Sequence, residues 1–385
     1  MGIKGLIGYL KKKNPEVFEN VKFEEYAFQK IAIDTAIFMC KFKASNGDDG
    51  WLDRFASLIV WMRRANVHPV FILELNDRMP PEKAAEKRKR AETRKRQEDR
   101  AELLSNAVDA YGECGGFLGL DERSATLLQE TFDTEIKRNG PTSVGRKKAL
   151  FLTSIAAASE FDIDIVKEKL TRGQKHMFTI KPEDYPNLKK LLDVLRVPWL
   201  LAPGEAEKEG ARMVRHNEAA AVLSEDSDCL AYKASTFLCK INFYNKTAER
   251  IKFSNLLETL GMNGEEFVDF CIMCGTDYNP NVRGTGAGKA FELIQKYKSI
   301  DNLPEKIDVS VLDHIMGRIL FHIEEKTEEK TEEKTEEKTE DTKTGSLYTG
   351  TPVRSEVEMF FFKFNMKTSV DTLMSAMSSN ELVFE

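Results

Sequence analysis

Residues 219–226 read AAAVLSED, a short apolar run that ends in carboxylates, and Asp228 follows two residues later. The same pattern occurs twice earlier in the chain, in residues 30–34 (KIAID) and in residues 69–74 (PVFILE). Each run has the length and composition of a buried strand, and helical patterns separate the three runs. Strands that alternate with helices form parallel sheets. The sequence therefore predicts an α/β fold with a mainly parallel central sheet flanked by helices.

All three predicted strands carry acids at the carboxyl end, which is where parallel α/β sheets bind ligands. Further acids follow a Pro-Gly turn and an apolar helix. The full set is Asp34, Glu74, Glu205, Glu207, Asp226, Asp228 and Asp277. Ion pairs or helix caps would explain any one of these acids taken alone. Seven carboxylates gathered without cations would repel one another, and Mg²⁺ prefers such oxygen ligands.

Two Mg²⁺ ions about 4 Å apart can generate a hydroxide and stabilise the leaving oxygen in phosphodiester hydrolysis. The chain has only five histidines, and none stands beside the seven acids. This composition argues against a zinc hydrolase, because catalytic zinc sites usually include histidine.

The charge of the chain is strongly segregated. The 385 residues contain 57 Lys+Arg and 63 Asp+Glu, a net charge of -6. Residues 324–343, a repeat of EEKT, account for -5, whereas residues 83–100 carry nine basic and four acidic side chains. The sequence therefore predicts a local basic surface on an acidic protein. No apolar run reaches the roughly 20 residues that span a bilayer, so we expect no membrane partner.

A glycine-rich turn, Gly284-Thr-Gly-Ala-Gly288-Lys289, separates two predicted helices, residues 265–275 and 289–297. It fails the phosphate-loop pattern, because Arg283 and Ala290 stand where glycine and Ser/Thr are required. Free backbone N–H groups in such a turn can hold a DNA phosphate. A simple connection between two helices is the alternative interpretation.

Taken together, these motifs resemble the structure-specific 5′-nucleases of the flap endonuclease/XPG type. The matching segments are residues 1–6 (MGIKGL), 31–34 (IAID), 202–207 (APGEAE), 224–229 (SEDSDC), 269–278 (DFCIMCGTDY) and 283–297 (RGTGAGKAFELIQKY). The resemblance implies a PIN-like 5′-nuclease fold with a helical arch insertion and a helix–turns–helix DNA-binding element.

The resemblance also implies a two-Mg²⁺ phosphodiesterase in which Mn²⁺ substitutes. Asp34, Glu74, Glu205 and Glu207 would hold the first ion, and Asp226, Asp228 and Asp277 would hold the second. Glu74 departs from the family pattern, which usually has Asp there. Lys83 and Arg90 match the basic pair of the family's gateway helix. With Asp34 and Asp228, they complete the expected catalytic set.

The resemblance extends to the DNA contacts and the partners. The expected DNA-binding residues are Gly2, Arg94, Gly284, Gly286, Gly288 and Lys289. A monovalent cation at the helix–turns–helix is a further expectation. The partners would be DNA with 5′ flaps or junctions, and we expect a monomer. A sliding clamp is a weaker candidate partner, because Phe360-Phe361 lacks the usual leading glutamine, with Arg354 in its place.

The composition shifts indicate six regions. These are an N-terminal nuclease region (1–100), an arch or cap insertion (101–180), an internal nuclease region (181–275), a helix–turns–helix region (276–320), a disordered EEKT insertion (321–347) and a C-terminal segment that packs back on the body (348–385). The six cysteines fit an intracellular protein, nuclear in a eukaryotic cell or at a cytoplasmic replication site for a virus.

The leading functional hypothesis is a 5′-flap endonuclease with 5′→3′ exonuclease activity. Because of Glu74, a DNA-junction binding protein with weakened catalysis is an alternative. A PIN-type ribonuclease would share the acidic α/β site, but such domains lack the helix turn at Gly284–Gly288. A 5′-exonuclease and a Holliday-junction resolvase remain open within the family, because the arch that governs this choice has no motif.

Overall fold

The computed structural model describes residues 2–74, 81–138, 161–176, 180–324 and 347–378. Their contacts divide the chain into two compact units, Met1–Glu86 with Ile180–Glu385, and Lys87–Thr179. Most of the predicted EEKT insertion lies outside the described residues. Within the described ranges, no helix is long and apolar enough to cross a membrane.

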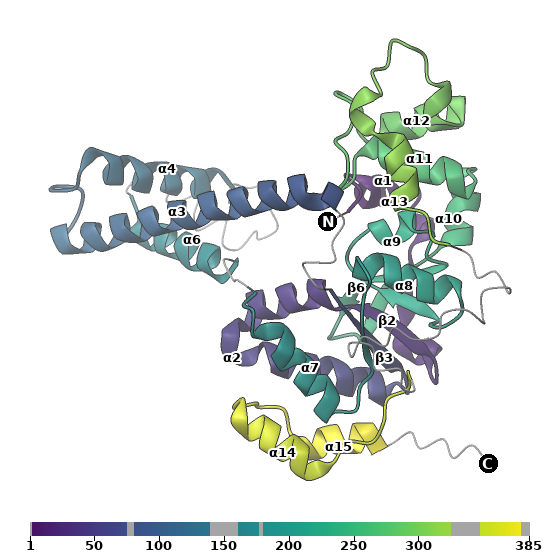
Figure 1. Ribbon diagram of the computed structural model, residues 1–385. Coiled ribbons are helices and arrows are strands. Elements are labelled where there is room, and N and C mark those ends of the chain that lie inside the picture. Colours follow the sequence, from purple (N-terminus) through teal and green to yellow (C-terminus); the bar gives the residue numbers. More distant parts are fainter. Residues whose placement is uncertain (1, 75–80, 139–160, 177–179, 325–346, 379–385) are drawn as a thin grey trace. The chain divides into compact units, whose positions relative to one another are not determined.

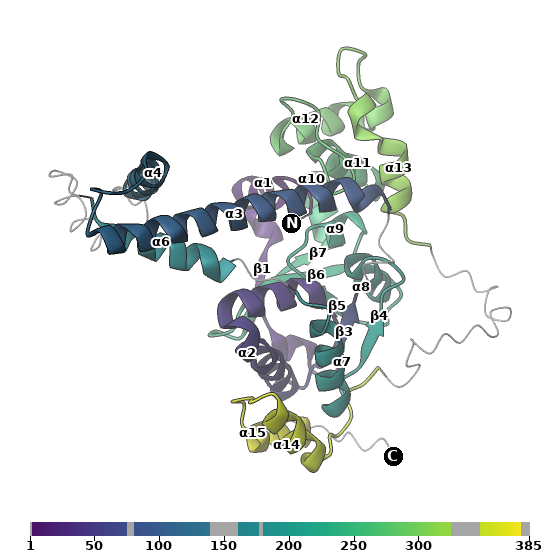
Figure 2. The same ribbon diagram turned by 60° about the vertical axis from the view of Figure 1, so that its left-hand side comes forward.

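A sheet forms the centre of the first unit (Figure 1). It has seven strands in the order β1-β7-β6-β5-β2-β3-β4. The strands are β1 (Glu19–Lys22), β2 (Lys30–Asp34), β3 (His68–Leu73), β4 (Trp199–Leu201), β5 (Ala221–Leu223), β6 (Thr236–Asn242) and β7 (Thr247–Lys252). From β6 to β4 all neighbours pair in parallel, which confirms the predicted α/β class. The antiparallel pairs β6–β7 and β7–β1 extend one edge of the sheet (Figure 2) and were not predicted.

Helices cover both faces of this sheet. The helices of the first unit are α1 (Leu6–Lys13), α2 (Thr35–Arg64), α7 (Asp184–Val194), α8 (Ala206–Arg215), α9 (Asp228–Ala231), α10 (Phe253–Leu260), α11 (Gly264–Cys274), α12 (Ala287–Tyr297), α13 (His314–Leu320), α14 (Arg354–Lys363) and α15 (Val370–Ser378). Because successive strand residues point to opposite faces, Ile31 and Ile33 belong to the buried core that includes α2 and α7, whereas Ala32 belongs to the one that includes α8 and α11.

The C-terminal helices α14 and α15 complete the core on the α2 face. Phe360, Phe361 and Leu373 are buried there together with residues of α2 and α7. The Phe360-Phe361 pair, considered above as a clamp-binding motif, is therefore occupied by packing within the chain. Phe362 beside it is 91% exposed.

The second unit consists of helices around a small apolar core of its own. It contains most of α3 (Ala84–Cys114), together with α4 (Glu122–Arg138) and α6 (Ile163–His176). Leu104, Leu128, Phe132 and Val166 are buried at its centre. Residues 88–100 of α3 are exposed throughout, so this stretch of basic helix contributes little to any core.

The packing of α8 on the sheet depends on the absence of a side chain at Gly210. A Cβ added there would lie 2.5 Å from Cγ2 of Val222 and 3.4 Å from Cδ1 of Ile72. We expect Gly210→Ala to destabilise the protein by about 1–3 kcal/mol, since overpacking forces a branched side chain off its rotamer. The measurement is urea unfolding followed by circular dichroism.

Gly8→Ala is the matched control for that substitution. Gly8 lies within α1, and an added Cβ would meet no heavy atom within 4 Å. This change should stabilise the protein by about 0.5–1 kcal/mol, because alanine favours a helix over glycine. Equal unfolding midpoints for the two variants would contradict the packing argument.

Candidate active site

Three parallel strands place the first carboxylates side by side. Asp34 ends β2, and its Oδ1 accepts a hydrogen bond of 3.1 Å from the backbone N–H of Ala36, which caps α2. Ser224, directly after the neighbouring strand β5, donates its hydroxyl to Oδ2 of Asp34 at 2.7 Å. Glu74 directly follows β3, which pairs with β2 on the other side. The topology therefore brings Asp34 and Glu74 to one edge of the sheet.

The start of α8 supplies two more carboxylates to this edge. Glu205 is the N-cap residue of α8 and Glu207 lies in its first turn, and both are buried. Oε1 of Glu74 accepts a hydrogen bond of 2.7 Å from the backbone N–H of Ala206. The longer side chain at position 74 is thus accommodated by capping a helix N-terminus, where a negative charge is stabilised.

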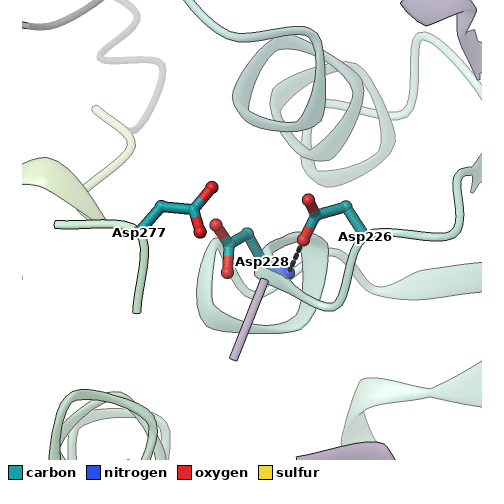
Figure 3. A group of neighbouring side chains, drawn as sticks. All are labelled: Asp226, Asp228 and Asp277. Atoms are coloured by element: carbon teal, nitrogen blue, oxygen red, sulfur yellow. Dashed lines mark hydrogen bonds between the residues drawn. The ribbon is translucent and has the colours of Figure 1, made fainter. Parts of the chain in front are cut away.

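A second group of carboxylates comprises Asp226, Asp228 and Asp277. Each offers one oxygen that lies within 4.8 Å of the others, a spacing that suits a shared cation. Figure 3 shows the carboxylate of Asp277 pointing toward that of Asp228. The backbone N–H of Asp228 donates to Oδ1 of Asp226 at 3.0 Å, which fixes the turn between the two. Asp277 reaches the group from the loop that follows α11.

Gly2 lies directly against this second group, which is one of the places where a glycine is required. Its φ angle is +82°, and an added Cβ would collide with Oδ1 of Asp226. It would also lie 2.7 Å from Oγ of Ser227 and 2.9 Å from Oδ1 of Asp228. The backbone N–H of Ile3 donates to Oγ of Ser227 at 2.9 Å and so holds the N-terminal segment in place.

Lys83 is the cation that the structure places among the acids. It ends a short 3₁₀ helix (Pro81–Lys83), and its ammonium forms an ion pair with Oε1 of Glu205. Its Nζ also lies 3.9 Å from Oδ2 of Asp277. Burial works to lower the pKa of Lys83, but the surrounding carboxylates outweigh it and raise the pKa, so the side chain stays charged.

Burial and neighbouring negative charges raise the pKa values of several of these carboxylates. Burial, reinforced by the charge of Glu74, raises the pKa of Asp34 to about 7. Burial likewise raises the pKa of Glu207, Asp226 and Asp228 above the ordinary range. Oε2 of Glu207 and both carboxylate oxygens of Asp228 are buried with no hydrogen-bond partner among the described residues. Buried, unsatisfied oxygens of this kind fit hard divalent cations.

These shifts predict that the metal-free protein loses stability as the pH rises. Asp34 binds its proton more tightly in the folded state than in the unfolded state, where its pKa is near 4. The stability that protonation contributes should therefore disappear between about pH 4 and about pH 7. We expect a lower melting temperature in EDTA at about pH 8 than at about pH 5, and recovery at the higher pH with Mg²⁺.

The control for the pH prediction is Asp34→Asn. In this variant the fall in melting temperature between the lower and the higher pH should be smaller than in the wild type. His68 acts in the opposite direction, because burial lowers its pKa to about 4, and this contribution is common to both proteins. The difference between the pH curves of the wild type and Asp34→Asn therefore gives the contribution of Asp34 alone. Parallel pH curves for both proteins would contradict the assignment.

The predicted glycine turn connects α11 to α12. Gly284 has a φ of +72°, and Gly286 is the N-cap residue of α12. Gly288 and the exposed Lys289 lie in the first helical turn, whose backbone N–H groups have no partner within the helix. The amide of Asn281 donates to the carbonyl oxygen of Thr285 at 2.8 Å and orders the loop.

Arg90 and Arg94, which were expected to contact the substrate, belong to the second unit. Both lie on the exposed stretch of α3. The structure therefore gathers the seven acids, Gly2 and Lys83 within the first unit, and it assigns these two arginines to a separate body.

Sequence reasoning missed three tyrosines near the acids. Tyr232 and Tyr278 both contact Glu205 through their hydroxyl groups. Tyr185 on α7 is near Glu74 and Asp34, whose charges add to the effect of burial and raise its pKa. A signal was available for Tyr232 and Tyr278, since Tyr278 follows Asp277 directly and Tyr232 lies one helical turn after Asp228.

Comparison with known proteins decides the family. Residues 1–97 match the XPG N-terminal domain, and residues 196–277 match the XPG I-region. A probable RAD2-like endonuclease of Invertebrate iridescent virus 3 is 32% identical over 344 residues, which cover 84% of this chain and 86% of the viral protein. The chain belongs to the XPG-type 5′-nuclease family.

Other members of the XPG-type family share parts of the sequence or the whole fold. Flap endonuclease 1 of Mus musculus is 32% identical over 148 residues, which cover 38% of this chain and 39% of the mouse protein. The structure of flap endonuclease-1 from Methanococcus jannaschii is 18% identical, with a TM-score of 0.54, and covers 95% of this chain and 96% of that chain. The predicted PIN-like 5′-nuclease fold is thereby confirmed.

Proposed function

We propose that this member of the XPG-type family is a Mg²⁺-dependent nuclease that cuts DNA at 5′ flaps and also degrades DNA from the 5′ end. The observation that carries the proposal is the convergence of seven carboxylates and Lys83 from separate segments of the first unit. Buried oxygens without hydrogen-bond partners among the described residues support a cation-binding role for this cluster.

Two groups of side chains would hold two ions. Asp34, Glu74, Glu205 and Glu207 would hold one, and Asp226, Asp228 and Asp277 the other. Bound Mg²⁺ would supply an activated water and stabilise the leaving oxygen, and Mn²⁺ should substitute because it accepts the same ligands. The protein's own contribution is to hold the oxygens in place, which the hydroxyl of Ser224 does for Asp34 and the backbone N–H of Ala206 does for Glu74.

Lys83 would act on the scissile phosphate. Its ammonium lies among the carboxylates, where it offsets their charge before substrate binds. A phosphate that enters the site would offer a new partner for this cation, since Lys binds phosphate as a point charge. Lys83 would then stabilise the negative charge that develops during cleavage. Gly2, whose missing side chain lets the N-terminal backbone lie against Asp226 and Asp228, would contact the DNA from that position.

Two further surfaces, one in each unit, suit a DNA backbone. The exposed stretch of α3 carries Arg90 and Arg94, which would bind phosphates of the 5′ strand. The turn before α12, with Gly284, Gly286, Gly288 and Lys289, would bind the duplex backbone. A monovalent cation in that turn, held by backbone carbonyl groups, is part of the same proposal.

The test is cleavage of a 5′-flap duplex in Mg²⁺ with an EDTA control. A panel of flap, nicked, gapped and four-way DNA, together with single-stranded RNA, ranks the possible substrates. Cleavage at the flap junction that EDTA abolishes supports the proposal. Preferential cutting of the four-way junction or of RNA would replace it with one of the alternatives.

The alternative of a weakened nuclease depends on Glu74. Its Oε1 is engaged by the N-terminus of α8, so only its other oxygen is open to a cation. Tight flap binding without turnover in either Mg²⁺ or Mn²⁺ would favour this alternative. Recovery of turnover in Glu74→Asp, which restores the family's usual residue, would then identify the cause.

A further inference from the structure

Two tyrosine hydroxyls converge on one oxygen of Glu205. The hydroxyl of Tyr232 donates to Oε2 of Glu205 at 2.6 Å, and the hydroxyl of Tyr278 bonds to the same oxygen. The two hydroxyl oxygens lie 2.7 Å apart, so they also contact each other. Glu205 is 2% exposed and Tyr232 is 1% exposed, which shields their hydrogen bond from water, whereas Tyr278 is half-buried.

Each tyrosine comes from a segment that carries an acid of the second carboxylate group. Tyr232 is the C-cap residue of α9, the short helix that begins at Asp228, and Tyr278 directly follows Asp277. Both reach across to Glu205, which belongs to the first group. The ring of Phe321 packs edge-on against both tyrosine rings, with centroid separations of 5.1 Å and 5.5 Å, and fixes their orientation.

The number of hydroxyl protons limits which oxygen of Glu205 is available to bind a cation. Two hydroxyl groups carry two protons for three oxygen–oxygen contacts. Either both tyrosines donate to Oε2, or one donates to it while the other donates to its neighbour. In each arrangement Oε2 of Glu205 is held by a charge-assisted hydrogen bond. Oε1 points toward Lys83 and is the oxygen that remains for a cation.

We propose that Tyr232 and Tyr278 are positioning residues that restrict Glu205 to one coordinating oxygen and thereby favour Mg²⁺ over Ca²⁺. The inference rests on the proposed function, because it assumes that Glu205 faces a divalent ion. Mg²⁺ demands near-octahedral geometry with single carboxylate oxygens, whereas Ca²⁺ accepts both oxygens of one carboxylate. A second bond from Oε2 to Ca²⁺ would forfeit the tyrosine hydrogen bonds.

Packing alone does not account for the hydroxyl groups. Phenylalanine would fill the same space beside Phe321 and would not bury a polar oxygen. A buried hydroxyl costs free energy unless it is hydrogen-bonded, and the bonds that satisfy these two hydroxyls are those to Glu205 and to each other.

The test compares divalent-ion binding to the wild-type protein, Tyr232→Phe, Tyr278→Phe and the double variant. Isothermal titration calorimetry with Mg²⁺ and with Ca²⁺, in the absence of DNA, gives both affinities. In the double variant we expect Mg²⁺ affinity to fall about 10-fold, the usual loss when a ligand loses its supporting hydrogen bond. Ca²⁺ affinity should change less, so the Mg²⁺/Ca²⁺ ratio should fall. Each single variant keeps one hydroxyl and should show a smaller change.

Tyr26→Phe is the matched control. Tyr26 is also buried, at 6% exposure, but it packs in the core on the other face of the sheet. Its ion affinities should equal those of the wild type. An unchanged Mg²⁺/Ca²⁺ ratio in the double variant, with either equal losses or no loss, would overturn the inference. If the wild-type protein binds neither ion, the proposed function fails first.

Discussion

Replacement of Asp228 by alanine is expected to lower flap cleavage by more than about 100-fold, since that loss is common when only a partner of a metal ligand is removed. Both carboxylate oxygens of Asp228 are buried and lack hydrogen-bond partners among the described residues. The hydrogen bond between Asp228 and Asp226 comes from the backbone N–H of Asp228, so alanine at this position keeps it. The measurement is single-turnover cleavage of a 5′-flap duplex in saturating Mg²⁺.

The same substitution should not harm the fold. Burial and the charges of Asp226 and Asp277 raise the pKa of Asp228, so the charged carboxylate destabilises the metal-free protein. Asp228→Ala removes that repulsion, and its melting temperature in EDTA should equal or exceed that of the wild type. Flap binding in EDTA should also be retained, because a negative charge near the phosphates is lost. Loss of binding together with cleavage would indicate misfolding and contradict this argument.

Asp269→Ala provides a contrast at a second buried aspartate. Asp269 is 3% exposed but fully engaged, since it accepts hydrogen bonds from Nε of Arg318 at 2.7 Å and from the backbone N–H of Ile300 at 3.0 Å. Removing it leaves a cation without its main partner. We expect a loss of about 2–3 kcal/mol, less than for a fully buried pair because Arg318 is one-third exposed. The two aspartates should thus have opposite effects on stability.

The sequence predicted those parts of the fold in which one strong pattern decides the outcome. The runs at 30–34, 69–74 and 219–226 are apolar, because strands covered on both faces need no alternation, and they became the centre of the parallel sheet. The strand ends then brought the acids to one edge. The resemblance supplied Lys83, and the structure gave its contacts with Glu205 and Asp277.

Other features depend on contacts between segments far apart in the chain. The antiparallel edge, in which Glu19 pairs with Arg250, is polar and half-exposed, so its sequence resembles a loop. The cap between Glu74 and Ala206 joins residues 132 positions apart. The position of Tyr232, one helical turn after Asp228, places it near the acids, but only the fold reveals that its hydroxyl contacts Glu205, 27 positions earlier in the chain. A hydrogen bond between residues so far apart leaves no pattern in the sequence around either partner.

Replacement of Lys83 by methionine is expected to reduce kcat for flap cleavage by about 10²–10³-fold, with little change in KM. Methionine keeps the apolar stem and removes only the charge. In the proposed mechanism that charge matters most when negative charge develops on the phosphate, so binding of the uncleaved DNA should be nearly unaffected. Steady-state kinetics on a 5′-flap duplex separate the two constants.

The charge of Lys83 also has a role before substrate arrives. Its side chain is 14% exposed, and the ammonium pairs with Glu205 within a group of buried acids. Without it, the carboxylates of Glu205, Glu207 and Asp228 would face one another with less compensation. Lys83→Met should therefore lower the melting temperature in EDTA, and saturating Mg²⁺ should restore much of the difference because the ions replace the lost cation.

Lys233→Met is the control for both effects. Lys233 pairs with Glu265 at 2.7 Å, and the side chain of Glu265 is 81% exposed, so this ion pair is close to solvent. Its removal should change kcat and the melting temperature little, as is usual for surface pairs. If Lys233→Met lowers kcat as much as Lys83→Met does, Lys83 does not act on the reacting phosphate. If Mg²⁺ leaves the Tm difference between Lys83→Met and the wild type unchanged, Lys83 does not offset charge within the carboxylate cluster.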